Sequence, residues 1–272
     1  MSEAQWVLAY NSSFSEWARA MKIRPGVVIA SLTDVGCQRE NNEDRYGYWE
    51  SEDDALFLRL GRVAVVADGM GGHEGGQIAS RIAVDAVLEI YSAAGESNPQ
   101  ERLLEAFREA HRRIQQQARE HPDLLGMGTT CTAFALVGEH LHFAHVGDSH
   151  LYLLRAANLR LLTRDHSLVA RLVETGMIRT EEAENHPQKH VLTAALGVAD
   201  EIEPDFPAEP LLLEKSDVLL VCTDGLWGQM TERELRDVMA SQPPADACRT
   251  LVQLARDRGG PDNITLQIAR VG

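Results

Sequence analysis

The sequence has few cysteines and no long apolar run, and each shortage excludes a class of protein. Its four cysteines are far apart among 272 residues and form no C-x-x-C pair, which argues against a disulfide framework and favours a reduced, cytoplasmic protein. No window of 18 apolar residues occurs, so no membrane span is expected. The first residues lack a basic cluster and a continuous apolar core, so a secretory signal is not expected either.

Basic residues are also scarce, with 26 Lys and Arg against 41 Asp and Glu, which gives a formal net charge of −15. Such a chain repels nucleic acid and anionic membranes, so neither is expected as a partner. An acidic protein that handles an anionic substrate needs a local cation, which is either a bound metal or a placed arginine.

Apolar periodicity predicts an α+β fold in which strands are covered by helices. Strands are expected at 27–33, 46–49, 62–67, 129–137, 140–146, 151–155, 159–162, 217–222 and 264–269. Helices are expected at 78–90, 98–121, 167–175 and 245–258, with a short one after the capping box that begins at Thr231. The second of these begins with an Asn98 cap, Pro99 at the first position and Glu101 at the third. Glu52-Asp53-Asp54 is expected to form a solvated turn. The four strands between 129 and 162 have short connections and should be mostly antiparallel. Because no internal repeat or low-complexity linker occurs, residues 26–272 are expected to form a single domain.

Residues 1–25 differ from the rest and are interpreted as an N-terminal extension. Trp6, Tyr10, Phe14, Trp17 and Met21 recur at spacings of 4, 4, 3 and 4, which predicts one face of a helix. This helix would pack on its own domain or dock on a partner.

Carboxylates recur at the ends of the predicted strands. Asp68, Asp148 and Asp224 each follow an apolar strand, Asp262 precedes one, and Glu43-Asp44 lies in a polar loop between two strands. If these ends converge, the clustered charges need a cation, and carboxylates are ligands of Mg²⁺ and Mn²⁺. Taken singly, Asp68, Asp148 and Asp262 also fit a turn, and the loop pair Glu43-Asp44 also fits a solvated surface.

The order of these motifs resembles that of the metal-dependent serine/threonine phosphatases of the protein phosphatase 2C type, in their bacterial branch. The resemblance runs from about Ala30 to Val271. It rests on Arg39-x-x-Asn42-Glu43-Asp44, Ala67-Asp68-Gly69-Met70-Gly71-Gly72, Gly128-Thr129-Thr130, Val146-Gly147-Asp148-Ser149, Leu162-Thr163-x-Asp165-His166-Ser167, Leu192-Thr193-x-Ala195-Leu196-Gly197, Cys222-Thr223-Asp224-Gly225-Leu226-Trp227 and Asp262-Asn263-Ile264-Thr265.

The resemblance implies two packed antiparallel β-sheets flanked by helices, a four-layer sandwich with a dinuclear Mn²⁺ or Mg²⁺ site at one end. It implies a flap at about residues 166–190. By the same resemblance, Asp68 bridges both metal ions, Asp224 and Asp262 hold the first ion, and Glu43 and the Gly69 carbonyl hold the second ion. Asp148 with Asp224 holds a possible third ion. Arg39 anchors the phosphate, and Asp44 and Asn263 support the metal ligands.

The expected reaction is hydrolysis of phosphoserine or phosphothreonine by direct attack of a metal-bridging hydroxide, with no phosphoenzyme. The expected partners are phosphorylated proteins, in opposition to a bacterial serine/threonine kinase. No C-x5-R loop is present, which argues against a cysteine-based phosphatase. A catalytically silent phosphoprotein-binding regulator and a small-molecule phosphomonoesterase stay open as alternatives.

Two positions depart from the family pattern. Met70 stands where some members have a histidine proposed as general acid, and His73 is not at the matching place. The proton donor is therefore not identified. His150 stands where arginine is usual, and a histidine on a strand is more often structural.

Overall fold

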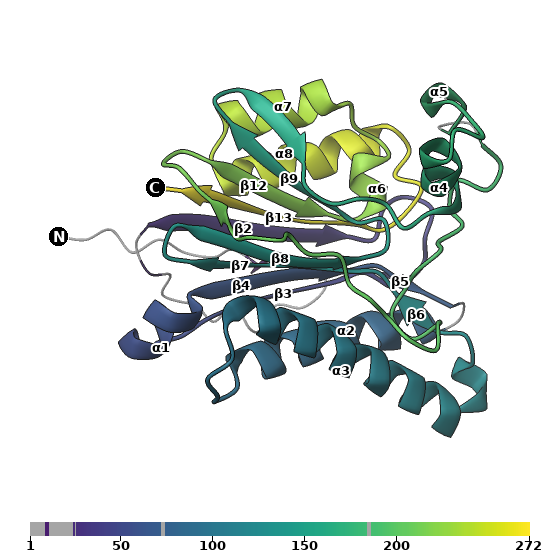
Figure 1. Cartoon of the computed structure of the whole chain (residues 1–272). Coiled ribbons are helices and arrows are strands. Elements are labelled where there is room, and N and C mark those ends of the chain that lie inside the picture. The colour runs from purple at the N-terminus through teal and green to yellow at the C-terminus, as the bar shows by residue number, and fades with distance from the viewer. Residues whose placement is uncertain (1–8, 11–23, 25, 72–73, 184–185) are drawn as a thin grey trace.

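The computed structural model of the chain describes residues 9–10, 24, 26–71, 74–183 and 186–272. Two β-sheets pack face to face, and helices cover the outer face of each (Figure 1). The predicted four-layer sandwich of antiparallel sheets and flanking helices is confirmed.

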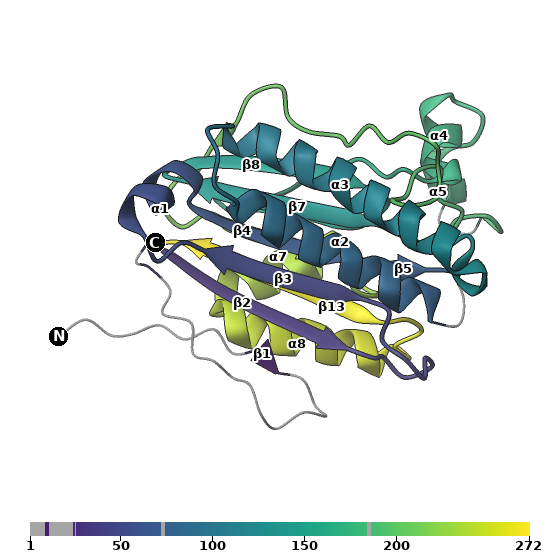
Figure 2. The ribbon, with the colours of Figure 1, turned by 90° about the horizontal axis from the view of Figure 1, so that it is seen from below.

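The first sheet has the strand order β11-β8-β7-β4-β3, and all of its pairs are antiparallel. Its strands are β3 (Arg45–Glu50), β4 (Arg62–Ala67), β7 (Cys131–Val137), β8 (His140–Val146) and β11 (Leu211–Leu212). Helices α2 (Gly75–Ser92) and α3 (Pro99–Glu120) cover its outer face (Figure 2). Every residue of β4 is buried because a sheet lies on one side and helices lie on the other, which explains its continuous apolar sequence.

The second sheet has the strand order β1-β2-β13-β12-β9-β10. Its strands are β1 (Ala9–Tyr10), β2 (Val27–Asp34), β9 (His150–Arg155), β10 (Asn158–Leu161), β12 (Val218–Cys222) and β13 (Ile264–Val271). Helices α7 (Glu232–Ser241) and α8 (Pro244–Asp257) cover its outer face. Its pairs are antiparallel except that β1 is parallel to β2.

Short elements complete the chain at its turns and ends. They are α1 (Asp54–Leu60), β5 (Gly69–Met70), a 3-10 turn (Pro122–Leu124), β6 (Gly128–Thr129), α4 (Leu168–Glu174), α5 (Thr180–Ala183) and α6 (Asp224–Trp227). Among the described residues, no helix is long and apolar enough to cross a membrane.

Alternation along the strands divides the core into three apolar layers. Val65 packs with α2 and α3 on the outside of the first sheet, whereas the adjacent Val66 packs between the two sheets with Leu219. Leu220, in turn, packs with Leu251 under α7 and α8. The two sheets are thereby fixed relative to each other, and so are the loops at their ends.

Most of the predicted elements are confirmed, and three differ. Residues 52–54, predicted as a solvated turn, instead start α1, because the Asp53 side chain accepts a hydrogen bond of 2.8 Å from Leu56 N and caps the helix. The single strand predicted at 129–137 is two strands, β6 and β7, which join different sheets.

In the N-terminal extension, Ala9 and Tyr10 pair with Ser31 and Leu32 as a strand, so the predicted helix is wrong at these two residues. Tertiary pairing with β2 replaces the helical period there. Trp6, Phe14, Trp17 and Met21 lie outside the described residues.

Candidate metal centre

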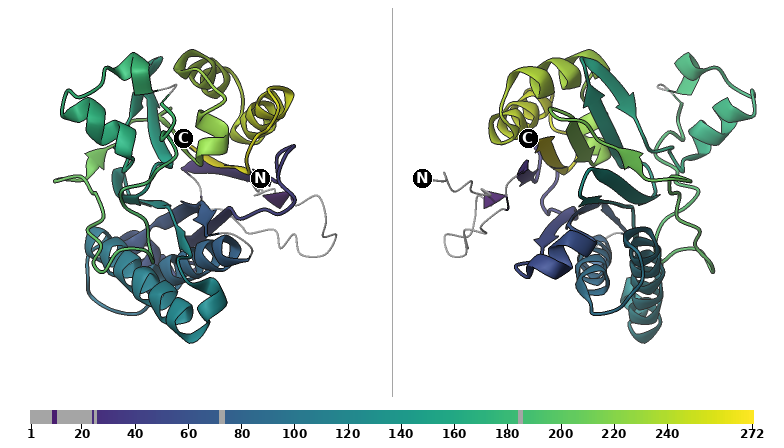
Figure 3. Two further views of the ribbon diagram at one scale, coloured as in Figure 1. Left: turned by 90° about the vertical axis from the view of Figure 1, so that its right-hand side faces the viewer. Right: turned by 60° about the vertical axis from the view of Figure 1, so that its left-hand side comes forward.

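The predicted carboxylates all lie at one end of the sandwich, which faces the viewer on the left of Figure 3. Asp68 directly follows β4, and Asp224, separated from the end of β12 by Thr223 alone, is the first residue of α6. Asp148 lies in the loop between β8 and β9. Asp262 precedes β13, whose first residues pair with the last residues of β12 and of β2. Antiparallel pairing therefore brings strand starts and strand ends to the same edge.

Mutual repulsion shows that these carboxylates share one space. Burial, followed by the charges of Asp44, Asp224, Asp148 and Asp262, raises the pKa of Asp68 well above its usual range. Because each added negative charge disfavours the next, the cluster cannot ionise fully without a cation.

Asp44 and Asp148 are affected in the same way. Burial, with the charges of Asp224 and Asp262, raises the pKa of Asp44 to about 7, although a hydrogen bond from Thr223 Oγ1 to its Oδ2 opposes this rise. Burial, with the charges of Asp224 and Asp165, raises the pKa of Asp148 to about 7.

Two oxygen atoms of the cluster fit a hard cation. Asp44 Oδ1 and Asp224 Oδ1 are buried and have no hydrogen-bond partner, which is costly for a charged acceptor. In the described part of the chain, no three His, Cys, Asp or Glu side chains stand close enough to enclose an ion by themselves. Mg²⁺ usually keeps several waters, so the donor set suits a hydrated cation held by a few carboxylates.

The backbone of Asp68 is clamped by two threonines whose role the sequence did not reveal. Its N–H donates to Thr130 Oγ1 at 3.0 Å, and its carbonyl accepts from Thr130 N at 2.9 Å and from Thr129 Oγ1 at 2.8 Å. Thr130 Oγ1 also lies 2.9 Å from Ser149 Oγ, next to Asp148. These contacts fix two candidate ligands relative to each other.

Glycines allow Glu43 and the Gly69 carbonyl to approach the start of α2. A Cβ on Gly69 would meet Gly76 O at 2.1 Å, and a Cβ on Gly76 would meet Glu43 Oε2 at 2.2 Å. Only glycine fits at either place. Asn263 holds the loop from the other side, since its Oδ1 accepts from Glu43 N at 2.8 Å and its Nδ2 donates to Val35 O and Asn41 O at 2.9 Å.

Arg39 lies at the mouth of the cluster, but its guanidinium pairs with a candidate ligand. Its Nη2 atom lies 2.7 Å from Asp262 Oδ2, and the Arg39 side chain is 54% exposed. The hydrogen bond to Asp262 and the charges of Asp262, Glu43 and Asp68 raise the pKa of Arg39 against the opposing effect of burial. The structure thus brings Arg39 to the site and places Asp262 in contact with it.

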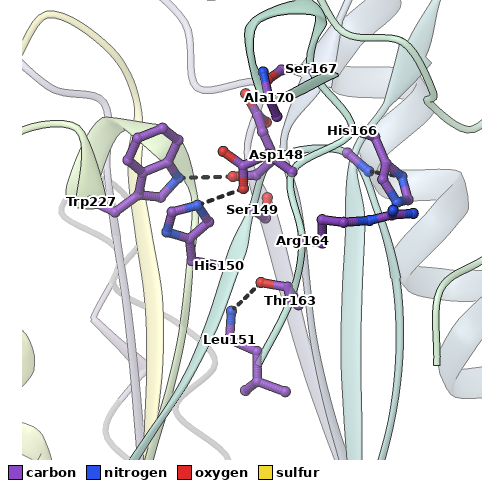
Figure 4. Close-up of polar contacts among 12 residues, drawn as sticks. Asp148, Ser149, His150, Leu151, Thr163, Arg164, His166, Ser167, Ala170 and Trp227 are labelled. Atoms are coloured by element: carbon purple, nitrogen blue, oxygen red, sulfur yellow. Dashed lines mark hydrogen bonds and ion pairs between the residues drawn. The ribbon is translucent and has the colours of Figure 1, made fainter. Parts of the chain in front are cut away.

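His150 belongs to a packed cluster behind Asp148, in agreement with the structural role expected for it. Its Nε2 lies 2.8 Å from Asp165 Oδ1, and its Nδ1 lies 2.6 Å from Tyr152 OH. Its ring stacks on Trp227 with centroids 4.2 Å apart, and Trp227 Nε1 donates to Asp148 O at 2.9 Å (Figure 4). The cluster therefore fixes the backbone of Asp148.

His190 also reaches the centre, and sequence reasoning did not single it out. It is exposed in the segment after α5, and its Nδ1 lies 3.9 Å from Asp224 Oδ2. Met70 pairs with Gly128 in the short β5–β6 ladder, and His73 lies outside the described residues.

Comparisons with known proteins agree with this arrangement. Residues 38–260 match the family described as protein phosphatase 2C. The chain is 38% identical over 244 residues to protein phosphatase PhpP of Streptococcus pneumoniae, an alignment that covers 88% of this chain and 96% of that protein.

Solved structures are similar as well. The S. agalactiae serine/threonine phosphatase is 37% identical with a TM-score of 0.82, covering 90% of this chain and all of that chain (100%). The catalytic domain of the serine/threonine protein phosphatase PstP, in complex with two manganese ions, is 32% identical with a TM-score of 0.78, covering 90% of this chain and 98% of that chain. The chain therefore belongs to the protein phosphatase 2C family, whose members are metal-dependent hydrolases of phosphoproteins.

Proposed function

We propose that this chain removes phosphate from phosphoserine and phosphothreonine residues of proteins in a metal-dependent reaction. The observation that carries the proposal is the carboxylate cluster at one end of the sandwich. Its members raise one another's pKa, and it includes two buried oxygen atoms without partners. The relatives named as protein and serine/threonine phosphatases support the choice of substrate.

We propose that Asp68, Glu43, the Gly69 carbonyl, Asp224 and Asp262 hold two Mn²⁺ or Mg²⁺ ions. The two manganese ions bound by PstP support this number. Asp148, with Asp224, is proposed to hold a third and weaker ion. When bound, such ions lower the pKa of a water molecule and neutralise charge on a phosphoryl group.

The chain's own groups bind and orient the substrate. Arg39 lies at the mouth, and its planar fork of N–H donors suits two oxygen atoms of a phosphate. Its Nη2 group becomes available to phosphate when it leaves Asp262. Thr129 and Thr130 hold the Asp68 backbone still, and Trp227 does the same for Asp148, so both carboxylates stay oriented while charge develops on the transferring group.

We propose that residues 26–272 form one catalytic domain and that the segment at 166–190 is a flap beside the site. Helices α4 and α5 project beyond the sheet ends at that side of the molecule, which supports this role (Figure 1). The N-terminal extension of residues 1–25 is proposed to dock on its own domain or on a partner.

We propose phosphoproteins made by a serine/threonine kinase as the substrates and the cytoplasm as the compartment. All four cysteines are free, and three of them are buried, which supports a reducing environment.

Hydrolysis of a phosphothreonine peptide with Mn²⁺, with Mg²⁺ and with a chelator tests the proposal. Activity should require the metal. Asp68→Asn and Asp224→Asn should each lose at least about a hundredfold in kcat, as removal of a group that stabilises developing charge does elsewhere. Asp85→Asn, which changes an exposed carboxylate on α2, is the matched control and should keep full activity. Metal-independent activity, or full activity of Asp68→Asn, would contradict the mechanism.

A further inference from the structure

A groove lies beside β10, away from the carboxylate cluster. Its volume of about 620 Å³ is in the range of ligand-binding pockets. One wall is the end of β10, and the other is a segment of residues 204–211, called the strap below. The strap is fixed to the first sheet at both ends, because Asp205 and His145 exchange backbone hydrogen bonds of 2.9 Å and β11 pairs with β8. Both walls are therefore firmly held.

The edge of β10 offers free backbone groups to this groove. β10 is the last strand of the second sheet in the part of the chain that the structure describes. Leu162 N donates to Leu151 O at 2.7 Å. Along an antiparallel pair, residues that bond to the partner strand alternate with residues whose backbone groups face away from it. Leu159 and Leu161 therefore direct their N–H and C=O groups away from β9. An extended peptide can add to an edge of this kind.

The side chains of the groove combine apolar and basic character. Phe206 is 51% exposed and Leu161 is 37% exposed, so both are available as apolar contacts. Arg160 is exposed on the groove, and no ion pair joins it to a carboxylate among the described residues. Asp205, the one acidic residue in the lining, already lies 3.4 Å from Arg164 Nη2 and 3.3 Å from His166 Nε2.

The end of β10 that lines the groove is a few residues away from the candidate metal centre. Leu161 pairs with Tyr152, which is four residues beyond Asp148. At about 3.3 Å per residue of extended chain, Asp148 and the end of β10 at Leu161 are therefore roughly 13 Å apart. Figure 4 shows Arg164 directed away from Asp148 and His150, although its neighbour Asp165 contacts His150. A peptide bound in the groove would reach the centre within roughly four residues.

We propose that this groove binds an extended, acidic segment of the phosphoprotein substrate, about four residues from the phosphorylated residue. Charge complementarity carries the choice of occupant. Arg160 presents a cation on the groove that no carboxylate of the described residues pairs with, on a chain whose net charge is −15, whereas Arg164 already lies 3.4 Å from Asp205 and 3.5 Å from Glu174. The backbone of the segment pairs with β10, a carboxylate of the segment faces Arg160, and an apolar side chain contacts Phe206. The inference rests on the proposed phosphatase activity and adds a substrate preference to it.

The test compares three phosphothreonine peptides that are identical except for residues three to five positions from the phosphothreonine, which are Asp/Glu, Ala or Lys. With Mn²⁺, the wild-type protein should hydrolyse the acidic peptide with a kcat/KM about fivefold above that of the Ala peptide. This is the scale of one or two partly exposed ion pairs. The advantage should shrink at high ionic strength, where exposed charges are screened.

Arg160→Glu should remove this advantage and reverse it in favour of the Lys peptide, while kcat/KM for p-nitrophenyl phosphate stays unchanged. Arg119→Glu makes the same charge change on an exposed residue of α3 outside the groove and should behave as wild type. Phe206→Ala should weaken hydrolysis of all three peptides without affecting the small substrate. Folding of each variant is checked by its melting temperature.

Equal rates for the three peptides with the wild-type protein would overturn the groove proposal. The same holds for an Arg160→Glu variant that keeps the wild-type preference or loses activity on p-nitrophenyl phosphate. In these cases the phosphatase activity itself stands. No hydrolysis of any substrate with Mn²⁺ would instead refute the proposed function.

Discussion

Removing the metal from this protein should make its stability fall as the pH rises from 6.5 to 8. Burial raises the pKa values of Asp44 and Asp148 to about 7, whereas an unfolded aspartate titrates near about 3.9. The folded state therefore binds protons that the unfolded state does not. The stability that these protons contribute is fully present below the unfolded pKa and is lost as the pH rises through the folded pKa.

The magnitude follows from these two shifts. A group with a folded pKa of about 7 loses about 0.8 kcal/mol of stability between pH 6.5 and 8, so the pair loses about 1.6 kcal/mol. Asp68, whose pKa is raised in the same direction, adds to this loss. At roughly 2–4 °C per kcal/mol for a domain of this size, this carboxylate loss alone should lower the melting temperature of the chelated protein by about 3–6 °C.

Buried histidines act in the opposite direction, and part of their effect falls inside this window. Burial lowers the pKa of His145 to about 3, whereas an unfolded histidine titrates near about 6.5, so His145 contributes stability that is lost as the pH falls. Between pH 6.5 and 8 it adds about 0.4 kcal/mol, which offsets part of the carboxylate loss. Because the histidine effect is the same with and without metal, the difference between the chelated and the Mn²⁺-loaded protein isolates the carboxylates.

The assay is thermal unfolding at several pH values, with chelator and with saturating Mn²⁺. The metal should remove the downward slope, so its stabilising effect should grow with pH. Asp44→Asn should reduce the slope of the chelated protein, and the exposed Asp85→Asn should not. A chelated protein whose stability is level or rises between pH 6.5 and 8 would refute the reasoning.

Two further substitutions test how the centre is supported. Thr223→Val should cost about 1–3 kcal/mol in urea unfolding, because it leaves Asp44 Oδ2 without the hydroxyl donor that lies 2.8 Å away. Thr223→Ser keeps this hydroxyl and should be nearly neutral. Equal costs for the two variants would contradict this role of Thr223. Gly76→Ala should cost about 1–3 kcal/mol in urea unfolding, because its Cβ would meet Glu43 Oε2 at 2.2 Å and the Gly69 backbone at 2.8 Å. It should also weaken Mn²⁺ binding in calorimetry by about 10–100-fold, since the new Cβ displaces Glu43. Unchanged Mn²⁺ binding would show that Glu43 is not a ligand.

The layers of the fold could be predicted from the sequence where local signals agree. The continuous apolar run of β4 indicated a buried strand, and the Asn98 cap indicated the start of α3; both are confirmed. The start of α1 was missed because the three acids at 52–54 resemble a solvated turn, and only the hydrogen bond from Leu56 N to Asp53 identifies a helix cap. The strand at Ala9–Tyr10 depends on the distant β2, which no local pattern contains.

The candidate site divides in a similar way. Carboxylates at the ends of apolar strands could be found from the sequence because antiparallel strands bring their ends together. The threonine clamp on Asp68 and the stack of His150 on Trp227 could not, because each joins segments that are 61–79 residues apart. Thr129, Thr130 and Trp227 were noted as parts of motifs, but only their partners in space explain what they hold.

The contact between Arg39 and Asp262 links metal binding to phosphate binding. Arg39 Nη2 lies 2.7 Å from Asp262 Oδ2, so a cation that takes this oxygen as a ligand competes with the guanidinium and thereby frees Nη2 for an anion. Phosphate should therefore bind more tightly to the metal-loaded protein, and phosphate should strengthen Mn²⁺ binding by the same factor, because coupling between two ligands is reciprocal.

Calorimetric titration of inorganic phosphate at several Mn²⁺ concentrations measures this coupling. Part of it comes from direct attraction between the metal and the phosphate and should survive in Arg39→Ala. The part carried by Arg39 should disappear in that variant, which should also bind Mn²⁺ more tightly in the absence of phosphate because Asp262 no longer has a competing partner. An Arg39→Ala variant that binds Mn²⁺ more weakly than wild type would show that the guanidinium orients Asp262 for the metal instead of competing with it.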